Sequence, residues 1–148
     1  MKILMVCLGN ICRSPLAQGI MENIVKEKDL DWIIDSAGTS SFHNGEAPDP
    51  RSIAVAKKND IDITSQRSRE ITKADLVDFD YIFAMDKSNY RDIEKLCTEE
   101  QKSKLKLFLR FGEAHEIEEV PDPYYTLGFD YVYDLINQAC KVVHTKLS

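Results

Sequence analysis

Eight residues near the start of the sequence combine an anion-binding composition with a reactive thiol. They are Cys7, Leu8, Gly9, Asn10, Ile11, Cys12, Arg13 and Ser14. A loop that leads into a helix can direct several backbone N–H groups at one anion, and the helix dipole favours negative charge there. Gly9 and Asn10 tolerate the left-handed dihedrals of such a loop. Arg13 offers a planar fork that matches two phosphate oxygens. The stretch therefore predicts a phosphate site that contains a nucleophile, Cys7.

A cysteine attacks phosphorus as its thiolate, so the loop must also stabilise negative charge on Cys7. A helix terminus alone contributes at most about 2 kcal/mol. The remainder has to come from the backbone N–H donors, the Arg13 charge and the Ser14 hydroxyl. Because all of these groups lie within the same eight residues, we expect no histidine base.

The residues around this loop predict a strand before it and a helix after it. Residues 2–6 form a short apolar run typical of a buried strand. Ser14 is the expected N-cap of the following helix and Pro15 its first residue. Further strands are predicted at residues 31–36, 80–85 and 104–109, and further helices at residues 50–58, 73–79, 87–96 and 130–147. This alternation predicts an α/β fold with a parallel sheet and helices on both faces.

Ligands of such sheets bind at the carboxyl ends of the strands. Four predicted loops lie at that edge: residues 7–14, 37–50, 86–89 and 110–129. Two of them exceed the usual ~2–6 residues of such connections, which favours a functional role. Asp86, in the third loop, is expected to cap a helix.

The composition restricts the class of protein. At 148 residues the chain fits one domain, residues 1–148, with 43% hydrophobic and 30% charged residues. The net charge of −6 argues against a nucleic-acid partner. Residues 3–8 are too short for a signal peptide, and no apolar stretch approaches the ~20 residues of a membrane helix. We expect a cytoplasmic protein without a membrane partner, and the sequence leaves its oligomeric state open.

The four cysteines, Cys7, Cys12, Cys97 and Cys140, do not have the spacing of a metal site. The close pair is separated by four residues, whereas zinc sites typically use pairs separated by two, and the three histidines are scattered. We therefore expect no metal and no cofactor. Cys97 and Cys140 are expected to be buried apolar residues.

The C-x5-R-S pattern at Cys7 resembles the signature of the low-molecular-weight protein-tyrosine phosphatases. Other segments resemble the family in the same order: D-S-A-G-T-S at residues 35–40, D-Y-I at 80–82, M-D-x-S-N-x-R-D at 85–92, and D-P-Y-Y at 122–125. The resemblance covers nearly the whole chain. It implies a flavodoxin-like, four-stranded parallel sheet of the phosphotyrosine protein phosphatase I type, in agreement with the element pattern.

The resemblance also implies an activity and catalytic residues. The expected reaction is hydrolysis of phosphotyrosine proteins or peptides, and of small aryl phosphates, through a cysteinyl-phosphate intermediate. Cys7 is then the nucleophile and Arg13 the phosphate clamp. Asp122 protonates the leaving phenolate and then activates water.

The remaining implied roles concern the loop and the substrate cleft. Ser14 is expected to hydrogen-bond the departing thiolate, and Asn10 with Ser36 to brace the loop. Three aromatic residues are expected to form the cleft walls: Phe42, Tyr124 and Tyr125. A deep aromatic cleft suits a phenyl ring and leaves the shorter phosphoserine unable to reach the thiolate.

Several alternative functions use a similar loop. Arsenate reductases relay a disulfide through two further, closely spaced cysteines, whereas Cys97 stands alone in the corresponding region. Cysteine-phosphorylated sugar-transport components lack the arginine at the end of the loop and need no Asp122. The full set of nucleophile, clamp and acid argues against a silent phosphate-binding module. Protein-arginine phosphatases resemble this chain but carry threonine where it has Ile11, which favours tyrosine.

Cys12 suggests a redox switch. A thiolate at Cys7 is prone to oxidation by peroxide. Cys12 lies five residues further along a loop that curls back on itself, so we hypothesise that it captures oxidised Cys7 in a reversible disulfide. The alternative is that Cys12 only packs beneath the loop.

Overall fold

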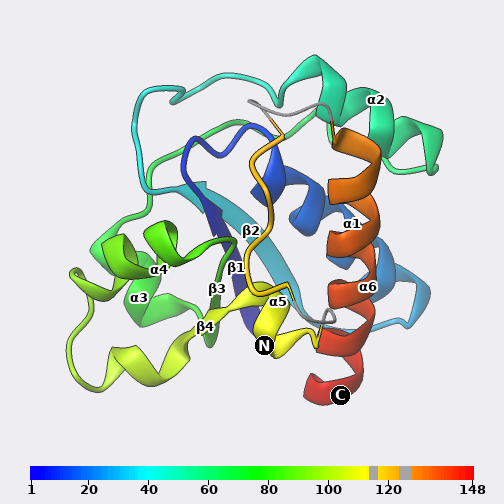
Figure 1. Ribbon diagram of the computed structural model, residues 1–148. Helices are drawn as coiled ribbons and strands as arrows, with labels where there is room; N and C mark the ends of the chain where they lie inside the picture. Colours follow the sequence, from blue (N-terminus) through cyan, green and yellow to red (C-terminus); the bar gives the residue numbers. More distant parts are fainter. Residues whose placement is uncertain (114–116, 124–127) are drawn as a thin grey trace.

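The sheet has the predicted parallel arrangement. The computed structural model describes residues 1–113, 117–123 and 128–148. Its four strands pair in the order β2-β1-β3-β4, all parallel (Figure 1). Their bounds are β1 (Lys2–Cys7), β2 (Ile33–Gly38), β3 (Tyr81–Ala84) and β4 (Leu105–Leu107). The α/β fold with a four-stranded parallel sheet is confirmed.

Helices cover both faces of the sheet (Figure 1). α1, α2, α5 and α6 pack on one face, and α3 and α4 on the other. The bounds are α1 (Arg13–Glu27), α2 (Pro50–Lys58), α3 (Lys73–Asp78), α4 (Lys87–Glu94), α5 (Phe108–Phe111) and α6 (Phe129–Leu147), with a short 3₁₀ helix, η1 (Gln101–Lys104). Within the part of the chain that the structure describes, no helix has both the length and the hydropathy of a membrane-spanning segment.

β1 is buried on both faces because its side chains alternate between two cores. Ile3 and Met5 pack against the α1 and α6 side, whereas Leu4 and Val6 pack against the α3 and α4 side. The strand order reverses direction between β1 and β3, which is the point where open α/β sheets form their ligand crevice. The loop after β1 leads into α1, and the loop after β3 leads into α4.

Two predicted features are wrong. Helix α1 begins at Arg13 with Cys12 at its N-cap, and Ser14 does not cap it. The Ser14 side chain instead contacts Asn10 and Cys7. The predicted fourth strand at residues 104–109 is shorter than expected, because Phe108 and Leu109 leave the sheet in α5 to fill the core on the α6 side.

Other predicted elements agree with the structure to within a few residues, although the second strand begins at Ile33 rather than at residue 31. Asp86 caps α4 as predicted, its Oδ1 accepting from the Asn89 N–H at 2.7 Å. Cys140 is fully buried as predicted, but the expectation that Cys97 is buried is wrong, because it is only partly buried at the edge of the α3 and α4 core.

The turn after α5 packs tightly on α6. A Cβ atom added to Gly112 would lie 2.6 Å from the Cβ and 2.8 Å from the Cα of Ala139. These contacts leave no room for a side chain at residue 112.

Candidate active site

The loop between β1 and α1 adopts the strained backbone that the sequence predicts, but at one residue only. Asn10 has a φ of 56°, in the left-handed region that asparagine tolerates. Gly9 contributes in another way. A Cβ on Gly9 would lie 2.9 Å from the Cδ2 of His43, so glycine allows the imidazole to approach the loop.

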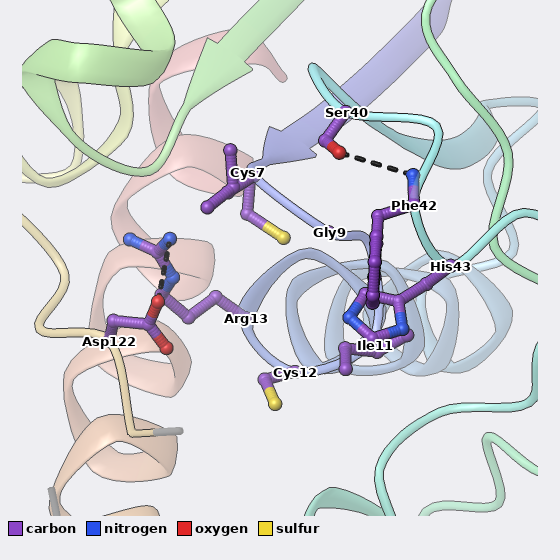
Figure 2. Close-up of a pocket in the computed structure, with 10 residues that line it drawn as sticks. Cys7, Gly9, Ile11, Cys12, Arg13, Ser40, Phe42, His43 and Asp122 are labelled. Atoms are coloured by element: carbon purple, nitrogen blue, oxygen red, sulfur yellow. Dashed lines mark hydrogen bonds and ion pairs between the residues drawn. The ribbon is translucent and has the colours of Figure 1, made fainter. Parts of the chain in front are cut away.

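The loop forms one side of a cavity of about 350 Å³ (Figure 2). The cavity joins residues from three of the four loops predicted at this edge of the sheet. Its lining residues are Cys7, Leu8, Gly9, Ile11, Cys12, Arg13, Ser40, Phe42, His43 and Asp122. The structure therefore brings the predicted nucleophile, clamp and acid to one space.

Cys7 lies at the end of β1 and is almost completely buried. Its Sγ is 3.0 Å from the Oγ of Ser14. Asn10 donates from Nδ2 to the Oγ of Ser14 at 2.7 Å and to the Oγ of Ser36 at 3.0 Å. Asn10, Ser14 and Ser36 thus form one hydrogen-bonded group beside Cys7.

Arg13 is buried, with 3% of its side chain exposed, yet it lies between two carboxylates. Its Nη1 is 2.7 Å from Asp86 Oδ2 and also donates to the carbonyl of Val120 at 3.1 Å. Its Nη2 is 3.7 Å from Asp122 Oδ2. Burial opposes the charge on Arg13, but negative charge at Cys7, Asp86 and Asp122 outweighs it and raises the pKa of the guanidinium. Arg13 is therefore a permanent cation.

Asp122 reaches the cavity from the segment that precedes α6. Val120 anchors this segment by donating its N–H to the carbonyl of Met85 at 2.8 Å. Pro121 and Pro123 flank Asp122 and restrict its backbone. The Asp122 side chain is 31% exposed, so its carboxylate meets both Arg13 and solvent (Figure 2).

The residues after β2 form the other wall of the cavity. Phe42 is 83% exposed, which leaves most of its ring free to contact a ligand. Its ring stands perpendicular to that of His43, with centroids 4.9 Å apart. The Nδ1 of His43 is 2.7 Å from Glu46 Oε2. Tyr124 and Tyr125, the other predicted wall residues, lie outside the described residues.

Three residues at this site were not predicted to belong to it. Ser40 and His43 lie in the long loop already assigned to this edge, but nothing local distinguishes them from their neighbours. Asp86 was assigned only as a cap, although its second oxygen pairs with Arg13. Its position directly after β3, across the crevice from β1, is the signal that could have indicated this role.

Cys12 shares the cavity with Cys7 but has a different electrostatic environment. Burial raises the pKa of the Cys12 thiol to about 12, and the negative charges of Asp49, Cys7 and Asp122 add to the effect, against a hydrogen bond with Ser52. Cys12 is therefore protonated at neutral pH. Within residues 1–113, 117–123 and 128–148, no group of three or more His, Cys, Asp or Glu side chains could hold a metal ion.

Comparison with known proteins points to one family. A family model described as low molecular weight phosphotyrosine protein phosphatase matches residues 2–148. A protein of that name from Schizosaccharomyces pombe is 42% identical over 127 residues, which is 84% of this chain and 81% of the relative. The low molecular weight protein-tyrosine-phosphatase YfkJ of Bacillus subtilis is 37% identical, over 95% of this chain and 91% of its own.

Solved structures agree with the sequence relatives. A protein tyrosine phosphatase from Entamoeba histolytica, with Hepes in its active site, superposes with a TM-score of 0.95 at 41% identity, covering 99% of this chain and 96% of that one. The drosophila arginine phosphatase DARP superposes with a TM-score of 0.93 at 35% identity, covering 100% and 98%.

Proposed function

The chain belongs to the family of low molecular weight phosphotyrosine protein phosphatases, and we propose that it works through a cysteinyl-phosphate intermediate on Cys7. It is a phosphoric monoester hydrolase that acts on phosphotyrosine. In the first step the Cys7 thiolate attacks phosphorus, so that the P–S bond forms as the P–O bond to the tyrosine ring breaks. Asp122 gives its proton to the leaving phenolate.

In the second step water attacks the phosphorus of the intermediate. Asp122, now a carboxylate, accepts a proton from this water, and the P–S bond breaks to release phosphate. The Ser14 hydroxyl, 3.0 Å from Cys7 Sγ, stabilises the thiolate that leaves. Asp122 is thereby returned to its acid form for the next cycle.

Arg13 binds the phosphoryl group in both steps. Its planar fork can donate to two oxygens at once, and the N–H groups of residues 8–12 surround the remaining negative charge. The pairing with Asp86 holds the guanidinium in place before substrate arrives, so little reorganisation is needed at the moment of reaction.

The single observation that carries this mechanism is the cavity shared by Cys7, Arg13 and Asp122, which come from opposite ends of the chain. The exposed ring of Phe42 at the same cavity supports an aromatic substrate group. We propose phosphotyrosine proteins or peptides as substrates. We also propose a cytoplasmic location, since all four cysteines are free thiols, as is usual in a reducing compartment.

A parallel assay on the wild-type protein and Cys7→Ser tests the mechanism. Its substrates are peptides with phosphotyrosine, phosphoserine or phosphoarginine, together with arsenate. We expect hydrolysis of the phosphotyrosine peptide by the wild-type protein alone, and binding of inorganic phosphate by both proteins. Appreciable turnover by Cys7→Ser would remove Cys7 from its role. Faster hydrolysis of phosphoarginine would assign the chain to the activity that the drosophila relative's name describes.

We further propose that Cys7 and Cys12 form a reversible disulfide after oxidation. Peroxide converts the Cys7 thiolate to a sulfenic acid, and the Cys12 thiol then displaces water as the S–S bond forms. The first reaction removes the negative charge of Cys7, which is one cause of the raised Cys12 pKa. Burial, the largest cause of the raised pKa of Cys12, remains after this oxidation.

A further inference from the structure

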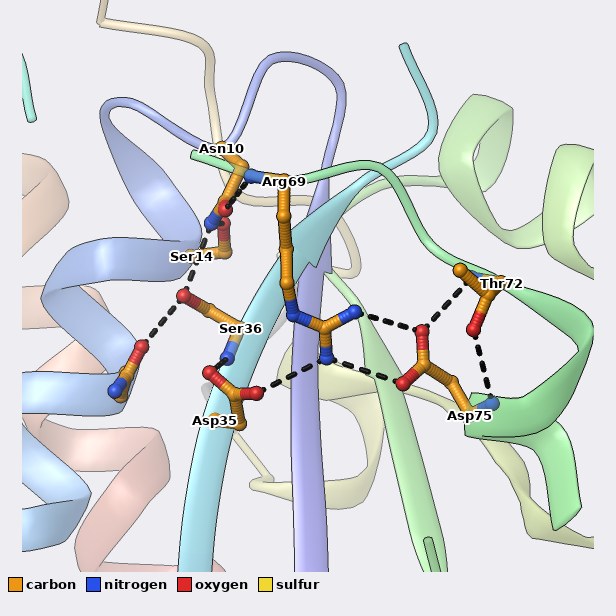
Figure 3. Close-up of polar contacts among 8 residues, drawn as sticks. Asn10, Ser14, Asp35, Ser36, Arg69, Thr72 and Asp75 are labelled. Carbon is orange, nitrogen blue, oxygen red and sulfur yellow. Dashed lines mark hydrogen bonds and ion pairs between the residues drawn. The ribbon is translucent and has the colours of Figure 1, made fainter. Parts of the chain in front are cut away.

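A short segment, residues 68–70, contacts the loop between β1 and α1, residues 8–12, which is the phosphate loop of the proposed mechanism. Figure 3 shows Arg69 of this segment bonded to Asn10. The segment continues the sheet beside the end of β2: the Gly38 N–H donates to the Arg69 carbonyl, and the Ile71 N–H donates back to the Gly38 carbonyl, both at 2.8 Å. Two further bonds reach the phosphate loop. The Ser68 Oγ donates to the Gly9 carbonyl at 2.8 Å, and the Arg69 N–H donates to Asn10 Oδ1 at 3.1 Å.

The bond from Arg69 fixes which way the Asn10 amide points. A backbone N–H can only donate, so the Asn10 oxygen has to face Arg69 and the Asn10 nitrogen has to face the other way. Its two protons go to the hydroxyl oxygens of Ser14 and Ser36.

Each hydroxyl has one proton, so accepting from Asn10 leaves that proton for the next partner. Ser36 donates to Gln18 Oε1 at 2.6 Å. The next partner of Ser14 is the sulfur of Cys7 at 3.0 Å. The Arg69 N–H therefore sets the orientation of Asn10, and this orientation makes Ser14 the donor in its hydrogen bond with Cys7.

The Arg69 side chain holds its own backbone in register. Its guanidinium lies between two carboxylates from different elements, donating to Asp35 on β2 at 3.0 Å and to both oxygens of Asp75 on α3 at 2.9 and 3.1 Å (Figure 3). Asp75 also accepts from the Thr72 N–H in the capping box of α3. Burial alone would raise the pKa of Asp75, but the bonds from Arg69 and Thr72 outweigh it and lower the pKa.

We infer that Arg69 is a positioning residue for the nucleophile: clamped by Asp35 and Asp75, it orients Asn10 so that Ser14 donates to the Cys7 thiolate. The inference rests on the proposed role of Cys7. Without the clamp, the segment keeps its bonds to Gly38 and Gly9, but the backbone N–H of residue 69 is held less firmly against the Asn10 oxygen. The amide can then rotate, and Ser14 loses its fixed donor direction.

The test compares Arg69→Met with Arg67→Met. Arg67 is an exposed arginine two residues away that donates to the carbonyls of Thr64 and Gln66, so it controls for loss of a charge in this segment. We expect Arg69→Met to slow alkylation of Cys7 by iodoacetate at pH 6 about 5–10-fold, the effect of weakening one hydrogen bond to a charged group. The kcat/KM for an aryl phosphate should fall in parallel, and Arg67→Met should match the wild-type protein.

Repeating both measurements in a Ser14→Ala background separates positioning from general damage to the fold. With the hydrogen bond from Ser14 to Cys7 removed, Arg69→Met should slow alkylation by less than about 2-fold. Equal slowing in both backgrounds, or no slowing in either, would overturn the inference. If Arg69→Met does not fold, Asp35→Asn and Asp75→Asn, which each weaken one arm of the clamp, replace it under the same criteria.

The same data distinguish a failure of the inference from a failure of the proposed mechanism. Rapid alkylation of Cys7 in the wild-type protein that is insensitive to Arg69→Met would overturn only the positioning role. Failure of iodoacetate to inactivate the wild-type protein would instead overturn Cys7 as the nucleophile, and the role of Arg69 with it.

Discussion

Replacing Asp86 with asparagine should destabilise the protein, because Arg13 is charged and buried and would lose its nearest carboxylate. Asp86 uses one oxygen to cap α4 and the other to pair with Arg13. Asparagine has only one oxygen, and it is itself a good N-cap. If that oxygen still accepts from the N–H that Asp86 caps, the side-chain amide nitrogen faces the Nη1 of Arg13. Two hydrogen-bond donors then face each other in place of the ion pair.

The magnitude follows from the burial of the pair. Breaking a fully buried ion pair costs about 3–5 kcal/mol, and a hydrogen bond to a charged group contributes about 1.5–3 kcal/mol. Arg13 is 3% exposed but Asp86 is 21% exposed, so water can replace part of the interaction. We therefore expect the free energy of unfolding to fall by about 1.5–3 kcal/mol. For a domain of this size, that corresponds to a decrease in Tm of roughly 3–10 °C.

Thermal unfolding followed by circular dichroism, with and without inorganic phosphate, measures this effect. In Asp86→Asn, inorganic phosphate can pair with Arg13 and is no longer repelled by the charge of Asp86. Phosphate should therefore raise the Tm of Asp86→Asn more than that of the wild-type protein. Asp130→Asn is the matched control, because Asp130 pairs with Lys58 at a similar 2.8 Å but both side chains are mostly exposed. Equal Tm values for Asp86→Asn and Asp130→Asn, or an unchanged response to phosphate, would refute the reasoning.

Four other experiments test separate parts of the structure. Asp122→Asn should lower kcat about 10²–10⁴-fold for aryl phosphates with poor leaving groups and by less for p-nitrophenyl phosphate; burst kinetics showing no dependence on the leaving group would count against Asp122 as the acid. The raised pKa of Cys12 keeps it protonated, so in the native protein iodoacetamide should modify it only at strongly alkaline pH, and peptide mapping that finds it modified at pH 7.5 would contradict this environment. After peroxide, dithiothreitol should restore activity in the wild-type protein but much less in Cys12→Ser; equal recovery without a Cys7–Cys12 peptide would exclude the disulfide. Gly112→Ala should lower the free energy of unfolding by about 1–3 kcal/mol in urea titrations, because the new methyl group meets the backbone of α6 at Ala139; an unchanged midpoint would show that the turn can move.

The place of the loop between β1 and α1 was predictable because the residue types that shape it lie within eight consecutive residues. The apolar run before Cys7 and the helical spacing after Pro15 fixed the loop at the carboxyl end of a strand. The same local reasoning failed at Ser14. Serine before proline is a common helix start, but here the hydroxyl is held by Asn10 and Cys7, and the helix begins at Arg13, two residues before the predicted start at Pro15.

Contacts between distant residues could not be predicted from local patterns. Asp86 pairs with an arginine 73 residues away, and Arg69 contacts an asparagine 59 residues away. Asp86 and Arg69 each belong to a segment whose own sequence explains it as a cap or a surface loop. Only the strand order β2-β1-β3-β4, which places their loops beside the loop after β1, gives them a role at the site.

The central position of β1 also bears on synthesis of the protein. β1 is the first of the four strands to leave the ribosome, yet it needs β2 on one edge and β3 on the other. At about 5–20 residues per second, roughly 4–15 s pass before residues 81–84 can pair with it. During that interval the apolar run Ile3, Leu4, Met5 and Val6 presents an unpaired strand edge, which is prone to association with other chains. Cys7, at the end of this run, is thus among the first residues made and among the last enclosed, because Asp122 on the same cavity is made much later.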